Sequence, residues 1–343
     1  MLHELDHLPR GLLDAGPTEL GRLLPGPSLL HLEGRRKEPL FIAVLLHGDE
    51  ETGWLAAREL LRRYRERTLP RSLSLFVGNV SAAREGKRSL PGQCDYNRIW
   101  SGNGGGLSPE ESMAAAVVDA MRKQNVFVTV DVHNNTGLNP HYAYVQRLGN
   151  RFLQLAAVFG RLVVFSRKPE GTLCGAFSAL CPSVAVECGR AEDSGGVPHT
   201  LDFLDACLHL AEVPDHPPAA RDVELYHSLA VVSVPDTASI SFDGSEADFA
   251  FRHDLDRLNF QELATGTRLA VLPRGRPASL EVRDEDDLDV AERYFSLQGG
   301  ELRSATPFIP AMFTVSEEAV RQDCLGYLME RMGPARKGED AGD

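Results

Sequence analysis

The amino-acid sequence predicts an α/β protein with a mostly parallel or mixed sheet and helices on both faces, followed by a smaller, mainly β C-terminal domain. In the first two thirds of the chain, short apolar runs of strand length alternate with segments of helical periodicity, a pattern typical of βαβ units. Farther on, shorter apolar runs are separated by glycine and proline turns, which indicates a β region. With 343 residues the chain exceeds the usual size of a single hydrophobic core, so two domains are expected.

The same pattern predicts where strands and helices lie. Five apolar runs are predicted to be strands: residues 41–46, 73–77, 126–132, 161–165 and 183–186. The first run is continuously apolar, as expected for a strand that is covered on both faces. A helix is predicted to begin at Glu50 or Glu51, where apolar residues start to recur at helical spacing. Another helix should follow Ser108, because Pro109 and Glu111 complete the signature of a capped helix N-terminus.

The predicted domain boundaries follow a change of composition near residue 213. Residues 1–212 form the predicted α/β domain, residues 213–221 a proline-rich linker and residues 222–335 the mainly β C-terminal domain. The charged end of the chain, residues 336–343, is predicted to be disordered. The glycine-rich stretch at residues 101–106 lacks the lysine of a phosphate-binding loop, so we interpret it as a flexible connector.

Charge and cysteine usage limit the classes of partner and the compartment. The chain has 36 basic and 49 acidic residues, a formal net charge of -13. This balance argues against nucleic acid and membrane partners, because both need a basic surface. Six scattered cysteines without a CxxC pair indicate free thiols in a reducing compartment. Since neither a signal peptide nor a transmembrane run is found, we expect a soluble, cytoplasmic protein, and leave open whether it forms a homo-oligomer.

A histidine and a glutamate with the spacing of metal ligands follow the first predicted strand. His47-Gly48-Asp49-Glu50 is one of five places where an acidic residue lies three positions after a histidine. Only this one joins a strand of buried type to a helix, an arrangement in which both side chains can converge on one point. A catalytic zinc ion takes three such ligands and keeps one position open for water. A polar turn at a strand end is the alternative interpretation.

Two further reactive residues close predicted apolar strands. They are His133 and Glu187. In open α/β sheets, ligands bind at the carboxyl edge of the strands, so His47, His133 and Glu187 are predicted to meet there. His133 alone could equally be a hydrogen-bonded structural residue. Asp131 lies on the same strand face as His133 and could orient a ligand histidine.

These residues belong to a series of motifs that occur in one order. The motifs are His47-Gly48-Asp49-Glu50, Gly78-Asn79 with Gly86-Lys87-Arg88, Asp95-Tyr96-Asn97-Arg98, Asp131-Val132-His133-Asn134-Asn135-Thr136 and Val186-Glu187-Cys188-Gly189. Their order and spacing resemble the succinylglutamate desuccinylase/aspartoacylase branch of the zinc carboxypeptidase superfamily. The resemblance covers most of residues 40–200 and implies a zinc-carboxypeptidase-like fold.

The resemblance also implies a metal centre and a general base. His47, Glu50 and His133 would bind one zinc ion per chain, and Glu187 would take a proton from the attacking water and return it to the leaving amine. Zinc lowers the pKa of a bound water to about 7, so a nearby carboxylate can act as the base at neutral pH.

Roles for three more residues carry over from the family pattern. Arg88 would stabilise the oxyanion, while Asn97 and Arg98 would bind a carboxylate of the substrate, for which a planar arginine fork is suited. The segment that follows Arg88 is longer than the family pattern. Lys87 or Arg84 could therefore take the place of Arg88.

The predicted function is hydrolysis of an amide bond in a small N-acyl amino acid or related acidic compound. One alternative is a zinc carboxypeptidase that acts on peptides with the same metal site and a more open cleft. Another is a metal-binding homologue without catalysis, against which the presence of Glu187 beside a full ligand set argues. The residues after Thr136 differ from those of aspartoacylase, so the resemblance does not identify the acyl group or the amino acid.

Overall fold

The computed structural model describes residues 1–101, 108–273 and 279–333 of the chain. Within this part the chain forms two compact units. Of the described residues, unit 1 comprises Met1–Asn134 and His141–Glu224, and unit 2 comprises Asn135–Pro140 and residues 225–273 and 279–333. Residues 102–106 of the predicted connector and the predicted tail at residues 336–343 lie outside the described residues.

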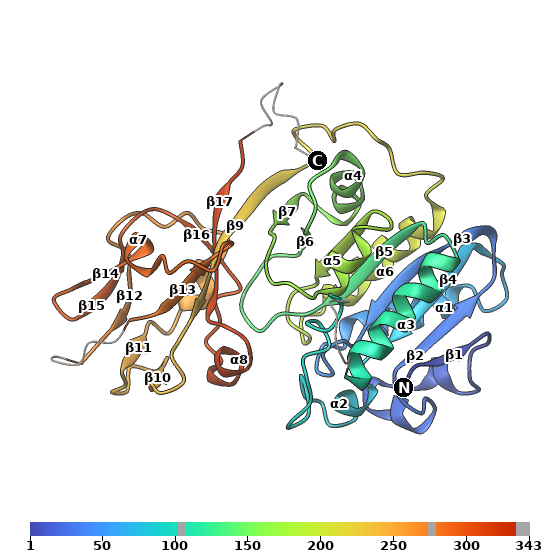
Figure 1. Cartoon of the computed structure of the whole chain (residues 1–343), viewed down its shortest axis with the longest axis horizontal. Coiled ribbons are helices and arrows are strands. Elements are labelled where there is room, and N and C mark those ends of the chain that lie inside the picture. The colour runs from blue at the N-terminus through green and yellow to red at the C-terminus, as the bar shows by residue number, and fades with distance from the viewer. Residues whose placement is uncertain (102–107, 274–278, 334–343) are drawn as a thin grey trace. The chain divides into compact units, whose positions relative to one another are not determined.

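Unit 1 is built on a mixed sheet whose central strands are parallel (Figure 1). Its strands run in the order β1-β2-β4-β3-β5-β8-β6-β7. Their bounds are β1 His3–Leu5, β2 Ser28–Leu32, β3 Gly34–Val44, β4 Leu69–Val77, β5 Val128–His133, β6 Tyr142–Val145, β7 Leu162–Phe165 and β8 Ser183–Glu187. Strands β4, β3, β5 and β8 are successive parallel neighbours, so their carboxyl ends lie at one edge of the sheet.

Helices cover both faces of this sheet. The helical segments of unit 1 are η1 Leu12–Asp14, η2 Pro17–Arg22, α1 Thr52–Arg63, α2 Val80–Arg84, α3 Pro109–Lys123, α4 Asn150–Phe159, α5 Leu173–Phe177 and α6 Gly196–His209. Helices α1, α4 and α6 pack together on one face, and α3 and α5 cover the other. A Cβ atom on Gly53 would lie 3.0 Å from Val132, so α1 approaches β5 closely. On the opposite face, the rings of Phe41 and Phe177 stack 4.7 Å apart.

Unit 2 is mainly β and has a hydrophobic core of its own. In one group of strands, β9 lies antiparallel to β13 and to β17, and β17 lies antiparallel to β16. A second sheet runs β10-β11-β12-β15-β14. The elements are β9 Glu224–Ser233, β10 Ile240–Ser241, β11 Phe249–Phe251, η3 Leu255–Leu258, β12 Arg268–Val271, β13 Glu281–Asp284, α7 Ala291–Tyr294, β14 Phe295–Gln298, β15 Glu301–Ser304, β16 Ile309–Ala311, α8 Glu317–Gln322 and β17 Gly326–Arg331.

The predicted fold class is confirmed, with a mixed α/β unit and a smaller, mainly β unit. All five strands predicted for the first region are present, and the capped start of α3 is formed by reciprocal hydrogen bonds between Ser108 and Glu111. Helix α1 begins at Thr52 rather than at Glu50 or Glu51, because the preceding residues form a turn. The sequence analysis did not predict β1, β2 and β6.

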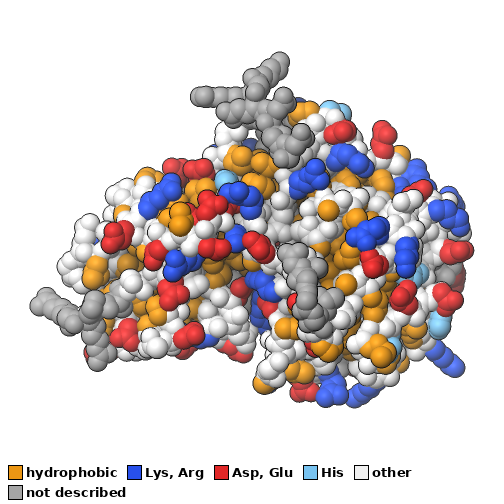
Figure 2. Space-filling model, viewed as in Figure 1, with side chains coloured by type: hydrophobic (Ala, Val, Ile, Leu, Met, Phe, Trp, Pro, Cys, Tyr) orange, Lys and Arg blue, Asp and Glu red, His pale blue; other side chains and the backbone are white. Residues whose placement is uncertain are grey.

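Charged side chains of both signs are interspersed over the face of the molecule drawn in Figure 2. Although the formal net charge is -13, the acidic side chains do not form one continuous patch on that face. None of the helices within residues 1–101, 108–273 and 279–333 combines the length and the hydrophobicity needed to cross a membrane.

Candidate metal centre and active site

Two of the predicted site residues end neighbouring parallel strands. His133 is the last residue of β5, Glu187 is the last residue of β8, and the two are paired in register. Side chains of such paired residues point to the same face of a sheet. Because Val132 faces α1, His133 and Glu187 face the side of the sheet that α3 and α5 cover.

His47 and Glu50 lie in the turn between β3 and α1. This turn is packed so closely against α2 that a Cβ atom on Gly48 would lie 2.2 Å from the backbone nitrogen of Ala83. Only glycine can occupy such a position, since real Cβ atoms do not approach backbone that closely. The Gly48 amide also donates a hydrogen bond to the carbonyl oxygen of Arg88, at 3.1 Å. The turn that carries His47 and Glu50 is thus fixed to α2 and to Arg88, both of which follow β4 in the chain.

The structure brings His47, Glu50 and His133 into one buried cluster. His47 Nδ1 lies 2.7 Å from Glu50 Oε1, and His133 Nδ1 lies 2.8 Å from Glu50 Oε2. One ligand atom from each residue lies within 4.8 Å of the other two. The same ring nitrogen of each histidine therefore faces the carboxylate, and the three residues could hold a metal ion.

Carboxylates also stand behind both imidazole rings. His47 Nε2 lies 3.0 Å from Asp95 Oδ1, and His133 Nε2 lies 2.9 Å from Asp131 Oδ2. Histidines that bind metals almost always have their second ring nitrogen oriented by such a group. This arrangement leaves Nδ1 of each ring for a metal, and it gives Asp131 the orienting position that the sequence analysis considered for it.

The charges in the cluster shift its pKa values in opposite directions. Burial would lower the pKa of His47, but the Glu50 charge and hydrogen bonds to Asp95 and Glu50 raise it above its usual value. Burial would also lower the pKa of His133, but the charges of Asp131 and Glu50 raise it well above its usual value. Burial would raise the pKa of Glu50, yet the two histidines lower it. The charged forms of the two imidazoles and the Glu50 carboxylate thus stabilise one another.

Arg88 lies beside this cluster. Its Nη1 atom is 3.7 Å from Glu50 Oε1, and its Nη2 atom is 3.2 Å from Asp95 Oδ2. Of the two alternatives from the sequence analysis, Arg84 is exposed and pairs with the neighbouring Glu85, and Lys87 is also exposed. The structure therefore brings Arg88 to the metal-ligand candidates despite the longer segment that follows it.

Asp95 is a site residue that the sequence analysis did not single out. Its Oδ1 atom contacts His47 and accepts a hydrogen bond from the Asn97 amide at 2.7 Å, while Oδ2 accepts one from Arg88. Burial would raise the pKa of Asp95, but contacts with His47 and Arg88 hold it below its usual value. One carboxylate thus joins a metal-ligand candidate to the predicted oxyanion arginine. The motif Asp95-Tyr96-Asn97-Arg98 carried the signal, because ligand histidines need such a partner.

Asn97 and Arg98 border the same cluster. The side-chain nitrogen of Asn97 lies 3.4 Å from His133 Nε2, and its oxygen accepts a hydrogen bond from the Leu173 amide at the start of α5. Arg98 is half-buried, donates to the carbonyl oxygen of Asn97 and helps to lower the pKa of Asp95. A Cβ atom on Gly171 would lie 2.5 Å from the Arg98 carbonyl oxygen, so the loop before α5 packs directly on this segment.

Asn134 connects the two strand ends that carry His133 and Glu187. Its side chain accepts a hydrogen bond from the Thr52 amide and donates to the Thr52 hydroxyl and to the Gly189 carbonyl oxygen, the last at 2.9 Å. These bonds tie the first turn of α1 to the turn that follows Glu187. Glu187 itself is half-buried at the sheet edge. The candidate metal ligands and the candidate base therefore rest on one hydrogen-bonded framework.

The comparison with known families covers this region. Residues 39–196 match the family model described as the succinylglutamate desuccinylase/aspartoacylase catalytic domain. The match includes the metal-ligand candidates, Arg88, Asn97, Arg98 and Glu187. Residues 39–196 are therefore similar to this catalytic domain. No curated protein matches the chain.

Solved structures of the succinylglutamate desuccinylase/aspartoacylase family share the fold. The enzyme from Rhodobacter sphaeroides is 17% identical, with a TM-score of 0.58 and coverage of 89% of this chain and 89% of that one. Succinylglutamate desuccinylase from Vibrio parahaemolyticus is 14% identical, with a TM-score of 0.57 and coverage of 89% and 85%. Murine aminoacylase 3 is 14% identical, with a TM-score of 0.53 and coverage of 87% and 96%. At these identities the similarity shows the fold and not the activity.

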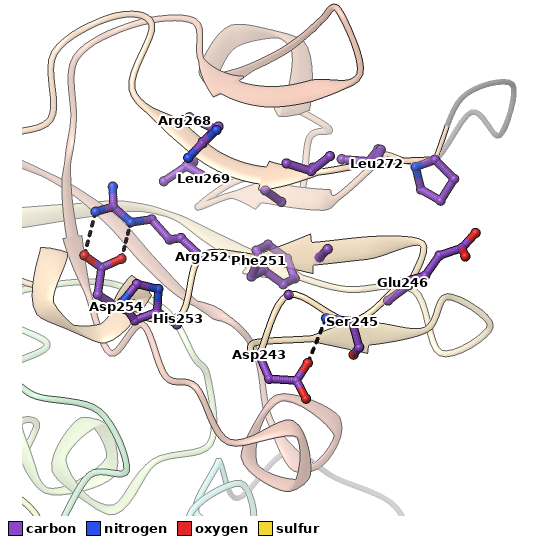
Figure 3. Close-up of a pocket in the computed structure, with 16 residues that line it drawn as sticks. Asp243, Ser245, Glu246, Phe251, Arg252, His253, Asp254, Arg268, Leu269 and Leu272 are labelled. Atoms are coloured by element: carbon purple, nitrogen blue, oxygen red, sulfur yellow. Dashed lines mark hydrogen bonds and ion pairs between the residues drawn. The ribbon is translucent and has the colours of Figure 1, made fainter.

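A cavity of about 930 Å³ lies in unit 2, outside the residues that match the family model (Figure 3). Strands β11 and β12 and the loop before β11 line it. Arg252 and Asp254 form a two-pronged ion pair at its border, with N–O distances of 2.5 and 2.7 Å. None of the predicted site residues lines this cavity.

Proposed function

We propose that the protein is a zinc-dependent hydrolase that cleaves the amide bond of a small N-acyl amino acid or a related acidic compound. The observation that carries the proposal is the convergence of His47 Nδ1, His133 Nδ1 and the Glu50 carboxylate, with a carboxylate behind each ring. Two imidazole nitrogens and a carboxylate are a ligand set that catalytic zinc sites use. The matched family and its solved relatives are named as desuccinylases and acylases, which supports an acyl group as the part removed.

The residues around the cluster suit the steps of amide hydrolysis. When bound, zinc would lower the pKa of a water molecule and polarise the acyl carbonyl group. Glu187 would take the proton of the attacking water and later donate it to the nitrogen of the leaving amine. Arg88 would stabilise negative charge on the carbonyl oxygen as the tetrahedral carbon forms, the term that usually contributes most to such reactions. Asn97 and Arg98 would hold a carboxylate of the substrate.

A hydrolysis screen with and without a chelator tests this proposal. Purified protein should hold about one zinc ion per chain and release amines from a panel of N-acyl amino acids. A chelator should stop turnover, and added zinc should restore it. A set of C-terminally free peptides belongs in the same screen, because a carboxypeptidase would prefer them. If the zinc-bound protein hydrolysed none of these compounds, the result would contradict the hydrolase assignment.

We expect the affinity for zinc to increase with pH through the neutral range. Protonated His47 and His133 stabilise the metal-free protein fully below about pH 6.5, and this contribution is lost as pH rises through their raised folded-state pKa values. Zinc binds only neutral imidazole, so it must displace those protons. Below the raised pKa values, affinity should increase about tenfold per pH unit for each proton released.

Calorimetry in buffers of different ionisation enthalpy measures how many protons zinc releases. Release of at least one proton at pH 7 is expected, because the pKa of His133 is raised well above its usual value. Zinc binding that releases none at that pH would mean that both histidines are neutral in the metal-free protein.

Arg98→Ala should lower kcat/KM about ten- to a hundredfold for an acidic substrate, the effect of losing one charge-assisted pair. Arg98→Lys should recover little, because the planar fork is lost. The measurement compares an acid with its uncharged amide analogue in wild type and variant. Selective loss on the acid supports recognition of a carboxylate. Equal loss on both substrates would show that Arg98 does not read that group.

A further inference from the structure

The segment that joins Arg88 to Asp95 connects two groups at the candidate active site. At one end the Arg88 guanidinium lies 3.7 Å from Glu50, and at the other end Asp95 lies 3.0 Å from His47. Between them, residues 89–94 turn back on themselves, with the Gln93 amide donating to the Leu90 carbonyl oxygen. Gly92 takes a positive φ of 78° in this turn, a conformation that suits glycine. The position of this turn therefore affects where both Arg88 and Asp95 lie.

The Gln93 side chain holds this turn through four hydrogen bonds. Its oxygen accepts from Asn79 Nδ2 at 2.9 Å and from the Leu90 amide at 3.0 Å. Its nitrogen donates to Asn79 Oδ1 at 3.0 Å and to the Ser81 hydroxyl at 3.3 Å. Gln93 and Asn79 thus form a reciprocal amide pair, in which each side chain both donates and accepts.

Asn79 is a fixed anchor for that pair. It is 1% exposed and lies two residues beyond the end of β4, and its backbone amide donates to the Leu45 carbonyl oxygen at 2.6 Å. Its side-chain oxygen also accepts from the Ala82 amide and so caps α2. The Gln93 side chain therefore connects the turn to the carboxyl edge of the sheet, at the strand next to the one that leads to His47.

Arg88 has a second connection to the same framework. Its carbonyl oxygen accepts the hydrogen bond from Gly48, the residue after His47. The backbone of Arg88 is thus fixed by the metal-ligand turn, and the segment that follows it is fixed by Gln93. Together they direct the guanidinium toward Glu50 and Asp95.

We propose that Gln93 is a positioning residue for catalysis, which sets the place of the Arg88 guanidinium through its amide pair with Asn79. The inference rests on the proposed hydrolase function and adds a residue whose side chain bonds to Asn79, Ser81 and Leu90 rather than to the metal-ligand candidates. A displacement of about 1 Å in a group that stabilises the transition state can lower the rate as much as a hundredfold. A residue that only stabilised the fold would instead change the stability of the protein without acting through Arg88.

A double-mutant cycle distinguishes these two roles. Gln93→Ala should lower kcat about ten- to a hundredfold with KM and zinc content little changed. In an Arg88→Ala background the same substitution should have little further effect on kcat, because the group that it positions is gone. Gln93→Glu keeps both accepting contacts and loses both donated bonds, so its kcat should fall between those of wild type and Gln93→Ala. The matched control is Gln154→Ala, which removes two hydrogen bonds to the His216 loop in the same unit.

Amide hydrogen exchange gives a readout that does not depend on activity. Exchange at Leu90 and Gly48 should be faster in Gln93→Ala, because Leu90 loses its acceptor and Gly48 donates to the residue whose place has changed. Unchanged kcat, or an equal fall of kcat in the wild-type and Arg88→Ala backgrounds, would overturn the proposal. If wild type bound zinc and hydrolysed no substrate, the proposed function would fail, whereas an active wild type with additive effects would refute only the role of Gln93.

Discussion

Glu187→Gln should lower kcat by about 10²–10⁴-fold while leaving the zinc content near one ion per chain. Glu187 ends β8, in register with His133 on β5, so its carboxylate is delivered to the sheet edge that carries the metal-ligand candidates. Glutamine keeps the shape and the ability to accept a hydrogen bond. It cannot take a proton from water or donate one to a leaving amine at neutral pH. The variant therefore separates the chemical step from metal binding.

The measurement for this variant pairs steady-state kinetics with metal analysis. Glu192→Gln is the matched control, because Glu192 lies five residues farther along the chain, is exposed and pairs only loosely with Arg190 at 3.6 Å. The control should retain wild-type turnover. A Glu187→Gln enzyme with near-normal kcat would remove Glu187 from the mechanism, and loss of zinc in that variant would assign it a structural role at the metal centre.

The sequence was sufficient to predict those parts of the candidate site in which an apolar strand ends in a reactive residue. The strands that lead to His133 and Glu187 are buried along almost their whole length and are mostly apolar, although Thr129, Asp131 and Ser183 interrupt them. Parallel strands place their carboxyl ends at one edge, so the meeting of these residues followed from the pattern alone. His47 was predicted at the same edge, but it lies three residues beyond the end of β3, and the packing of Gly48 against α2 that holds its turn leaves no sign in the sequence.

Contacts between distant polar side chains could not be predicted in the same way. The bond between Asp95 and His47 spans 48 positions, and the amide pair of Gln93 with Asn79 spans 14. Neither leaves a periodic signal, since each depends on how a turn folds back on the sheet. The assignment of Asn135–Pro140 to unit 2 is of the same kind. This segment begins two residues beyond the end of β5, a strand of unit 1, and its composition gives no sign that it belongs to the other unit.

Strands β1, β2 and β6 were missed for a different reason. Strand β1 has three residues, too few for an alternating or apolar pattern to be distinguished from a loop. Strand β6 has four residues, two of them tyrosines, so its apolar run is weaker than that of the equally short β7. Strand β2 contains His31 among its apolar residues. It is held by antiparallel pairing with β4, which lies more than 40 residues farther along the chain. Pairing with neighbouring strands rather than local sequence therefore decides that these segments are strands.

His133→Ala should reduce the affinity for zinc by about 10²–10⁴-fold, which is the share of one ligand in a three-ligand site. The same substitution should also destabilise the metal-free protein. There His133 carries a raised pKa and faces two carboxylates, Glu50 at 2.8 Å and the fully buried Asp131 at 2.9 Å. Removing one partner of a buried ion pair leaves the other uncompensated, at a cost of about 3–5 kcal/mol.

The two effects are measured by zinc titration against a competing chelator and by thermal unfolding of the metal-free protein. His47→Ala is the second variant, and it should show the same loss of affinity even if His133→Ala proves too unstable to purify. His209→Ala is the control, since His209 is an exposed residue at the end of α6. Full zinc occupancy in both ligand variants would mean that other residues bind the metal. If both ligand variants lose affinity for zinc and the His209→Ala control keeps it, the metal is assigned to the buried cluster of His47, Glu50 and His133. The control shows that removing an exposed histidine from the same unit does not affect zinc binding.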